Sequence, residues 1–547
     1  MATLDWIVLG VFFLGLIGII AWVLRQKEKD TTDYFLAGKN AGWLSIGSSI
    51  FASNIGSEHL VGLAGAGFIS GMAMAHWEMH AWWIIILGWV FVPFYDRIKI
   101  FTMPEFLEHR FSSGSRSVLS AISLVSYVLT KVAVTVYAGG VVFKTVFGIE
   151  SMWGIDFFWI SAIGLVVITG LYTIFGGMKA IMYTSVLQTP VLLIGSIVIL
   201  VVGLLKVGGW AEVERLAGPN MHLVRSAADP EFPWTGVLFA SAIIGFWYWC
   251  TDQYIVQRVL SGRNQKEARR GSILAGYFKL LPVFIFLIPG MIAFALYQKG
   301  LLTIPTNTIT GGPDADKAFS SLVAQLLPIG FKGVVVCGLL AALMSSLSSL
   351  FNSSAALFVG DFYKKIKPQS TEEHLLRVGR IATAVVVILG ILWIPVMKGM
   401  GNVLYKYLQS VQGYLAPAIA IAFIFGVFWK KSNAKAGLWT LLVGFSLGIF
   451  RLFLDVIKDS LPVDSFFYTI ASVNWLHYEE IIFVICGLIM ILISKFGKPA
   501  TLEQQQYTIY AASAENKKET RASWNKWDVV HTVIILSIIV AFYIYFW

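Results

Sequence analysis

Apolar runs of about 20 residues recur along the whole chain, and short polar loops separate them. A helix of this length spans the hydrocarbon core of a bilayer, so the pattern predicts an all-α polytopic membrane protein with about fourteen transmembrane helices. The predicted spans are residues 6–24, 43–70, 73–95, 118–147, 157–175, 181–207, 234–256, 273–297, 334–358, 382–396, 403–427, 438–453, 481–494 and 529–547.

The basic residues of the loops support this count. Cytoplasmic loops collect Lys and Arg, and one side of the predicted bundle carries roughly 28 of the 41, against about ten on the other side. The strict alternation predicts a multi-pass protein of the cell (plasma or inner) membrane with both termini outside the cytoplasm. The polar stretch 498–526 is predicted to be a flexible cytoplasmic linker. Loops 208–233 and 454–478 are expected to carry short interfacial helices.

Composition excludes a water-soluble protein, because 57% of the residues are hydrophobic and only 13% are charged. The net charge of +10 follows from the basic loops, so it does not indicate nucleic acid. Cys250, Cys337 and Cys486 all fall within apolar spans, which indicates neither a disulfide framework nor a metal cluster. An acidic residue precedes the first apolar run and basic residues follow it, the reverse of a signal peptide.

The second predicted span is interrupted at its centre. Residues 48–67 read SSIFASNIGSEHLVGLAGAG, with Asn54, Gly56, Glu58 and His59 inside the apolar run. A helix can break at membrane depth only where protein or a water-filled cavity satisfies the freed backbone groups. Secondary transporters use such breaks to present carbonyl groups to a cation and helix ends to a substrate. The stretch therefore predicts a transport site.

Polar residues inside other spans supply candidate ligands for a substrate. Glu78, Lys279 and Gln409 each lie within an apolar run, and His59 follows the break. Inserting an ionisable side chain at this depth costs roughly 2.5–3.5 kcal/mol, so such a residue indicates a functional or structural role. The four groups offer the donors and acceptors that would hold the hydroxyl groups of a neutral polyol. A buried ion pair between Glu78 and Lys279 that holds two helices together is the alternative.

A run of serines in the ninth span, SSLSSLFNSS at 345–354, offers a candidate cation site. Hydroxyls three or four residues apart share one helix face. If that face meets the carbonyls freed near Ala52 and Ile55, the result is an all-oxygen site without formal charge, which suits a monovalent cation better than a divalent one. Ordinary helix packing is the alternative, since small and hydroxyl residues are common at membrane helix contacts.

Aromatic residues lie close to these polar positions in the sequence. Trp77 precedes Glu78, Trp247, Tyr248 and Trp249 are consecutive, and Tyr405 precedes Gln409 by four residues. Sugar rings have apolar faces that stack on aromatic rings, and bulky rings can also gate a cavity. Core or interfacial packing is the alternative in a chain with 14% aromatic residues.

These residues, in this order, resemble the solute:sodium symporter family and its sodium/glucose cotransporter branch. The resemblance covers most of the chain and rests on DYFLAGKNAGW, FASNIGSEHLVGLAGAG, TMPEFLEHRF, YTIFGGMKAIMYT, WYWCTDQYIVQR, GYFKLLPVF, LAALMSSLSSLFNS and FWKKSNAKAG. It implies a LeuT-like inverted repeat of five plus five helices with discontinuous second and seventh spans face to face. It also implies four regions: 1–40, a peripheral helix and basic loop; 41–227 and 228–430, the two repeats; and 431–547, peripheral helices with the linker 498–526.

The resemblance also assigns roles to residues. It implies sodium, the coupling ion, at the carbonyls of Ala52, Ile55 and Ala342 and the hydroxyls of Ser345 and Ser346. It implies sugar binding by His59, Glu78, Lys279, Gln409 and Trp249. The implied gates are Tyr248, supported by Asn54, on the inside and Leu63, Trp77 and Tyr405 on the outside.

Three positions bear on ion number and on the sugar. Ser185 replaces an aspartate that many members link to a second sodium site, so one sodium is expected. Gly245 replaces a polar residue of sugar-transporting relatives, which leaves the identity of the sugar open. Ala81 matches some of those relatives and decides little.

The sequence thus predicts sodium-coupled symport of a neutral, glucose- or galactose-like hexose by alternating access. The alternatives within the class are symport of myo-inositol or of another small solute such as an amino acid, and outside it a sodium-responsive sensor or a channel-like protein. His59 with Glu78 is the one conceivable catalytic pair, so an enzyme is not expected. The oligomeric state stays open.

Overall fold

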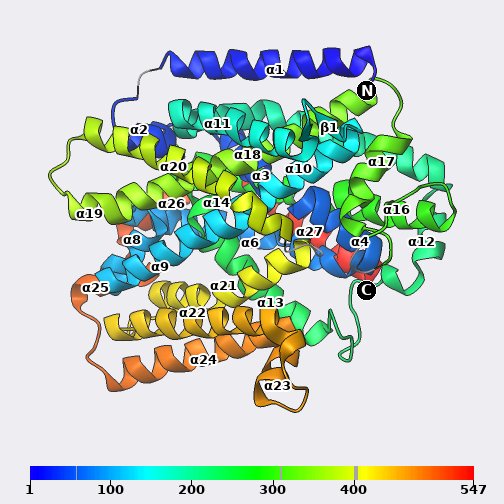
Figure 1. The fold of residues 1–547 in the computed structure, drawn as a ribbon. Helices are drawn as coiled ribbons and strands as arrows, with labels where there is room; N and C mark the ends of the chain where they lie inside the picture. Colours follow the sequence, from blue (N-terminus) through cyan, green and yellow to red (C-terminus); the bar gives the residue numbers. More distant parts are fainter. Residues whose placement is uncertain (27, 57, 308–310, 400–403) are drawn as a thin grey trace.

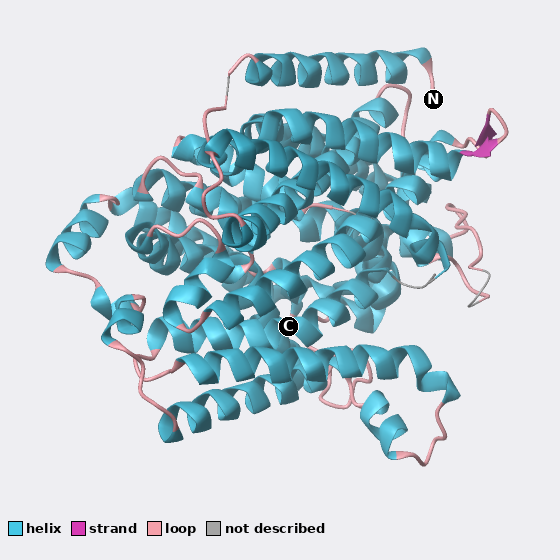
Figure 2. Ribbon diagram, turned by 60° about the vertical axis from the view of Figure 1, so that its left-hand side comes forward, coloured by secondary structure: helices cyan, strands magenta, loops and turns pink. Residues whose placement is uncertain are grey.

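The protein is described here by a computed structural model that covers residues 1–547 apart from 27, 57, 308–310 and 400–403. Nearly all of the described chain is helical (Figure 2). Strands β1 (Ser151–Met152) and β2 (Ile155–Asp156) form an antiparallel pair and are the only strands in the described part. The all-α prediction is therefore confirmed.

The described residues contain twelve helices that are long and apolar enough to cross a membrane. The fourteen predicted spans map onto them, because 59–98 and 157–207 each cover parts of two predicted spans. The second of these is α11 (Phe157–Val207), which bends at Gly177, where φ is 49° and ψ is −149°. Only glycine adopts this conformation readily. A Cβ at Gly177 would also lie 2.5 Å from the carbonyl oxygen of Tyr34.

The first half of the chain supplies the helices that bracket the first break. They are α1 (Thr3–Leu24), α2 (Thr31–Leu36), η1 (Ala37–Lys39), α3 (Trp43–Asn54), η2 (Glu58–Leu63), α4 (Ala64–Ser70), η3 (Gly71–Met74), α5 (Ala75–Glu78), α6 (Ala81–Ile86), η4 (Leu87–Phe91), α7 (Val92–Ile98), α8 (Met103–Arg110), α9 (Ser113–Ser126), η5 (Tyr127–Val132), α10 (Ala133–Phe147), α11, α12 (Trp210–Ala217) and η6 (Gly218–Met221).

The second half contains the serine-bearing helix and the peripheral C-terminal helices. They are α13 (Trp234–Phe246), η7 (Trp247–Thr251), α14 (Gln253–Leu260), α15 (Gln265–Lys279), η8 (Val283–Leu287), α16 (Ile288–Gln298), η9 (Ala315–Lys317), α17 (Ala318–Leu326), α18 (Phe331–Leu357), η10 (Phe358–Tyr363), α19 (Lys364–Ile366), α20 (Glu372–Gly399), α21 (Leu404–Phe428), α22 (Ala434–Ile457), η11 (Lys458–Ser460), α23 (Phe466–Ser472), α24 (Trp475–Phe496), α25 (Leu502–Gln506), η12 (Ile509–Ala511), α26 (Ala514–Ala522) and α27 (Lys526–Phe546).

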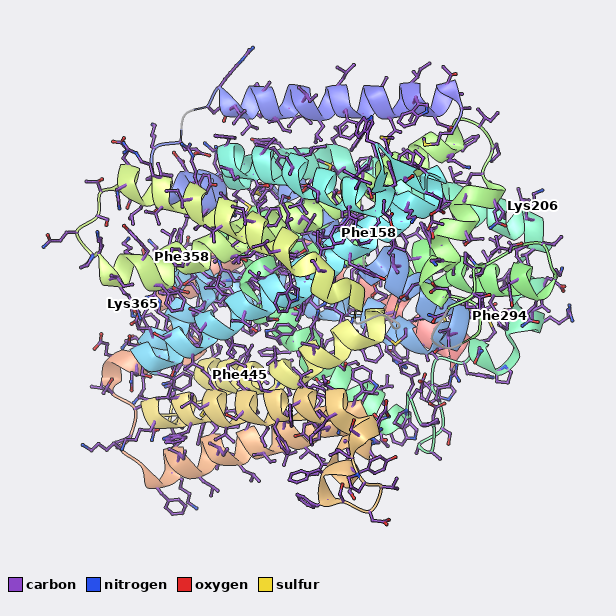
Figure 3. All side chains as sticks on the ribbon, in the orientation of Figure 1. Phe158, Lys206, Phe294, Phe358, Lys365 and Phe445 are labelled. Atoms are coloured by element: carbon purple, nitrogen blue, oxygen red, sulfur yellow. The ribbon has the colours of Figure 1, made fainter. Side chains whose placement is uncertain are left out.

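The long helices run roughly side by side between two ends of the bundle (Figure 1). Both chain termini lie toward the right of this view, whereas α19, α25 and α26 lie toward the left. Lys365 is at the left end and Lys206 at the right, with Phe158 and Phe445 between them (Figure 3). The termini therefore share one end of the bundle, opposite these three helices.

Burial separates central from peripheral helices. The most apolar window of the helix that begins with α18 is 89% buried within the protein, whereas those of α1 and α27 are 22% buried. The small residues of α18 let its neighbours approach closely. A Cβ at Gly338 would lie 3.1 Å from the Cα of Leu192 on α11. The serine-bearing helix is thus the centre of the bundle.

The stretch 498–526 differs from the predicted flexible linker. It contains α25, η12 and α26, and arginines of the core bind it. Arg97 donates a hydrogen bond to the carbonyl of Thr508 (2.6 Å), and Arg269 donates one to the hydroxyl of Ser523 (2.6 Å). These contacts cannot be read from its polar composition. Segments 208–233 and 454–478 do contain short helices, α12 and α23.

Candidate functional site

The first predicted break is present in the structure. Helix α3 ends at Asn54, Ile55 is extended (φ −79°, ψ 107°), and the chain resumes as the π-helical turn η2. Within the described part of the chain, no backbone N–H outside the helices binds the carbonyl oxygens of Ala52 and Ile55. Both residues are buried, so these oxygens need other partners.

A second break lies in the seventh predicted span. Helix α13 and the π-helical turn η7 end at Asp252, which is extended (φ −76°, ψ 127°) and caps α14. The ammonium of Lys131 lies 2.9 Å from the Asp252 carboxylate. On α14, the hydroxyl of Tyr254 donates a hydrogen bond to the carbonyl of Ser53. This contact joins the two broken helices, as the resemblance implied.

A polar cavity lies beside these breaks, and its free volume in this conformation is about 40 Å³. This volume holds water molecules, so a larger ligand requires the lining side chains to move apart. The structure brings together all five residues predicted to bind substrate and three of the predicted gate residues. They are His59, Glu78, Trp249, Lys279 and Gln409, with Asn54, Trp77 and Tyr248.

Charged groups form a compact cluster in this cavity. The ammonium of Lys279 donates a 2.6 Å hydrogen bond to the carboxylate of Glu78, and the His59 ring lies 3.4 Å from the same oxygen. Lys279 also lies over the ring of Trp249, 5.2 Å from its centroid. The alternative of a buried ion pair is therefore correct in its geometry, but the pair also faces the cavity.

Several buried polar atoms around the cavity have no hydrogen-bond partner among the described residues. They are Nδ1 of His59, Nε1 of Trp77, Nε2 of His80 and Oε1 of Gln409. Buried polar groups in native proteins are almost always paired, so unpaired ones at a cavity indicate where a ligand or water binds. Their mixture of donors and acceptors suits hydroxyl groups.

The predicted cation residues lie where α3 ends against α18. Ala52, Ile55, Ala342, Ser345 and Ser346 are at most 2% exposed. The Tyr254 hydroxyl lies 3.2 Å from that of Ser346, and the hydroxyls of Ser53 and Ser349 are 2.7 Å apart. The serine face therefore meets the broken helix. Among the described residues no group of three or more His, Cys, Asp or Glu could hold a metal ion, so this place offers neutral oxygens only.

Residues 34–444 match the family model described as the sodium:solute symporter family. The chain belongs to this family. Rabbit (Oryctolagus cuniculus) sodium/myo-inositol cotransporter 2 is 34% identical over 534 residues, which cover 91% of this chain and 77% of the relative. Rabbit sodium/glucose cotransporter 1 is 35% identical over 532 residues, 90% of this chain and 79% of the relative.

A solved structure of a Na⁺-coupled sialic acid symporter, described as substrate-bound and outward-open, shares the fold. Its TM-score is 0.72 at 23% sequence identity, and the match covers 91% of this chain and 99% of the other. The predicted fold class, a LeuT-like bundle with discontinuous helices, is confirmed by this likeness. Transporters of this family use sodium as the coupling ion, which was also predicted.

Two predicted gate residues are not among the described residues that line the cavity. Leu63 is fully buried at the end of η2, and the side chain of Tyr405 lies outside the described residues. The sequence also missed lining residues, namely His80, Ile244, Leu408 and Gln412. Helical spacing could have found Gln412, which is three residues after Gln409 on the same helix face.

Ser185, at a position where the resemblance implied an aspartate in many family members, lies beside the cation residues. Its hydroxyl donates a hydrogen bond to the carbonyl of Ile181 (2.6 Å) and is 3.4 Å from the hydroxyl of Ser345. A serine supplies no charge at this place. A second cation here would lack the carboxylate that offsets its desolvation.

Proposed function

We propose that this protein couples the entry of sodium to the uptake of a neutral sugar or sugar-like polyol by alternating access. The observation that carries the proposal is the shared cavity, where an ion pair, an amide and unpaired donors and acceptors meet beside two broken helices. Glucose- or galactose-like hexoses are the first candidates. Myo-inositol is the second, because relatives named for glucose and for myo-inositol are equally similar to this chain.

In this proposal the polar cluster binds the hydroxyl groups. The Glu78 carboxylate accepts hydrogen bonds, the Lys279 ammonium donates them, and the free oxygen of Gln409 accepts one more. His59 holds Glu78 in place, and Trp249 supplies a ring face beside Lys279. An anionic substrate is disfavoured, because Glu78 would repel it where water is scarce.

Sodium binds between α3 and α18 in this scheme, at the carbonyls of Ala52, Ile55 and Ala342 and the hydroxyls of Ser345 and Ser346. The ion bridges the broken helix to the central helix, so it stabilises the outward-open arrangement and raises the affinity for sugar. One sodium crossing 100 mV releases about 2.3 kcal/mol. A tenfold gradient adds about 1.4 kcal/mol. Together they concentrate a neutral solute several hundredfold, so a second ion is not needed.

The contacts around the cavity also support the proposed inner and outer gates. Tyr248 lines the cavity on the side of the second break, where the Lys131 ammonium lies 4.7 Å from its ring centroid. Asn54 lies 3.5 Å from His59 at the first break. These contacts support an inner gate of Tyr248 and Asn54. Trp77, which stacks on Trp475 at 5.9 Å, would close the outer side together with Leu63 and Tyr405.

The proposed setting is the cell membrane, with both termini outside the cytoplasm. The support is the Lys- and Arg-containing helices α19 and α26 at the end of the bundle opposite the termini (Figure 1). A transporter, rather than an enzyme, is what this family implies.

The test is uptake into proteoliposomes. Purified protein is reconstituted with sodium or potassium outside, and labelled glucose, galactose, myo-inositol, proline and sialic acid are compared. Sodium-dependent accumulation of a hexose or of inositol is the expected result. Glu78→Ala and Lys279→Ala should each abolish it. Uptake of proline or sialic acid alone would overturn the sugar assignment, and wild-type sugar affinity in Glu78→Ala would overturn the site.

A further inference from the structure

Gly245 on α13 leaves a space that two side chains of another helix fill. A Cβ at this glycine would lie 2.4 Å from Cδ1 of Trp83 and 2.9 Å from Nδ1 of His80. Neither distance is compatible with a side chain at position 245 unless the rings move. The bare backbone of Gly245 is therefore what admits the His80 imidazole to this place.

The His80 ring is part of the cavity wall. It lines the cavity together with Glu78, Lys279 and Ile244, the residue before Gly245. The side chain is 4% exposed, and its Nε2 has no partner among the described residues. A neutral imidazole carries one donor and one acceptor. A hydroxyl group of the substrate would satisfy this nitrogen.

The backbone holds the ring in place. His80 lies in the turn between α5 and α6, with φ −67° and ψ 9°, and its carbonyl accepts a 2.9 Å hydrogen bond from the N–H of Trp83. This turn interrupts the regular helical rotation, so His80 reaches the same cavity as Glu78 although the two residues are only two positions apart. On a continuous helix these two side chains would face different directions.

His76, a neighbouring buried histidine, has a purely structural role and serves as a comparison. His76 is also buried, but its Nδ1 lies 2.8 Å from the Tyr543 hydroxyl and its Nε2 lies 2.9 Å from the Leu223 carbonyl. Both nitrogens are thus used within the chain, and His76 does not line the cavity. His80 differs in both respects.

We propose that His80 is a sugar-contacting residue, admitted by Gly245, that reads one hydroxyl group of the substrate and so contributes to specificity. The inference rests on the proposed function. A site built around a hydroxyl rejects an analogue that lacks it, because the buried partner is then left unpaired.

The experiment measures discrimination rather than uptake alone. Monodeoxy analogues of the transported polyol, each lacking one hydroxyl, compete against uptake of the labelled parent into proteoliposomes with sodium outside. In the wild type, one analogue should inhibit roughly tenfold less well than the parent. In His80→Ala the apparent affinity for the parent should fall roughly tenfold, whereas the affinity for that analogue should not change. The ratio of the two affinities therefore falls to about one. His80→Asn should keep part of the discrimination.

Two further variants control for folding. His76→Asn, a buried histidine outside the cavity, should leave every ratio unchanged. Gly245→Ala should displace the His80 ring and reduce discrimination at the same hydroxyl, which tests the inference if His80→Ala does not fold. Unchanged ratios in folded His80→Ala, or a loss spread equally over all analogues, would overturn the inference and leave the proposed function standing. A wild type that takes up no neutral polyol would instead overturn the proposed function.

Discussion

Replacing Lys279 by methionine leaves the Glu78 carboxylate inside the membrane, 1% exposed, with the His59 ring 3.4 Å away. Removing one partner of a buried ion pair costs about 3–5 kcal/mol, because the other charge stays desolvated. The unfolding equilibrium constant should therefore rise by two to more than three orders of magnitude. The double variant Glu78→Gln/Lys279→Met removes both charges, and such replacements are often neutral for stability. Denaturant titration in detergent, followed by tryptophan fluorescence, measures both effects.

A transport assay distinguishes the role of the Glu78–Lys279 pair in substrate binding from its role in stability. Hydrogen bonds to charged groups are worth about 1.5–3 kcal/mol each, so losing two at the substrate lowers uptake efficiency at least about a hundredfold. The double variant should therefore be stable and inactive. The control is Arg451→Met, which breaks an ion pair between the buried Arg451 and the more exposed Asp455, 2.9 Å apart and away from the cavity. It should lose stability and keep the KM for sugar. Uptake by the double variant close to that of wild type would refute the binding role.

Other consequences of the structure can be checked with single variants. Ser345→Ala should raise the sodium concentration for half-maximal uptake about tenfold, whereas Ser354→Ala on the same helix should not, as sodium titrations would show. Glu479 on α24 is fully buried with both carboxylate oxygens unpartnered in the described chain, so Glu479→Met, which removes these polar atoms, should stabilise the protein by about 1–3 kcal/mol; lower stability would contradict this. Gly177→Ala should destabilise it by about 1–3 kcal/mol, because of its positive φ and the nearby Tyr34 carbonyl, and an unchanged melting temperature would count against that bend.

The sequence was sufficient for the spans and for the first break. Hydropathy is a local property, so the apolar runs predict helices wherever they fold. Asn54, Gly56 and His59 interrupt one run, and the structure breaks α3 at that point. Glu78, Lys279 and Gln409 could be predicted as cavity residues because an ionisable or amide side chain in an apolar run is costly.

Features that depend on turns and on distant contacts could not be predicted in this way. His80 joins the cavity through a turn that interrupts helical periodicity, which hydropathy does not show. The predicted span begins at residue 481, so hydropathy assigns Glu479 to the preceding loop. In the structure α24 begins at Trp475, and Glu479 is buried within this helix. The contact of Tyr254 with Ser53 joins residues 201 positions apart. The helices within 498–526 form against arginines of the core, although the composition of that stretch is polar.

The central claim is that sodium and a neutral polyol cross the membrane together through the Glu78–Lys279 cavity. Simultaneous measurement of labelled sodium and labelled sugar entering proteoliposomes tests it most directly, with wild type and Glu78→Gln/Lys279→Met side by side. The account predicts that in wild type the two fluxes rise together in a fixed ratio near one, and that the double variant shows neither coupled flux. Sugar entry that is the same in sodium and in potassium would contradict it.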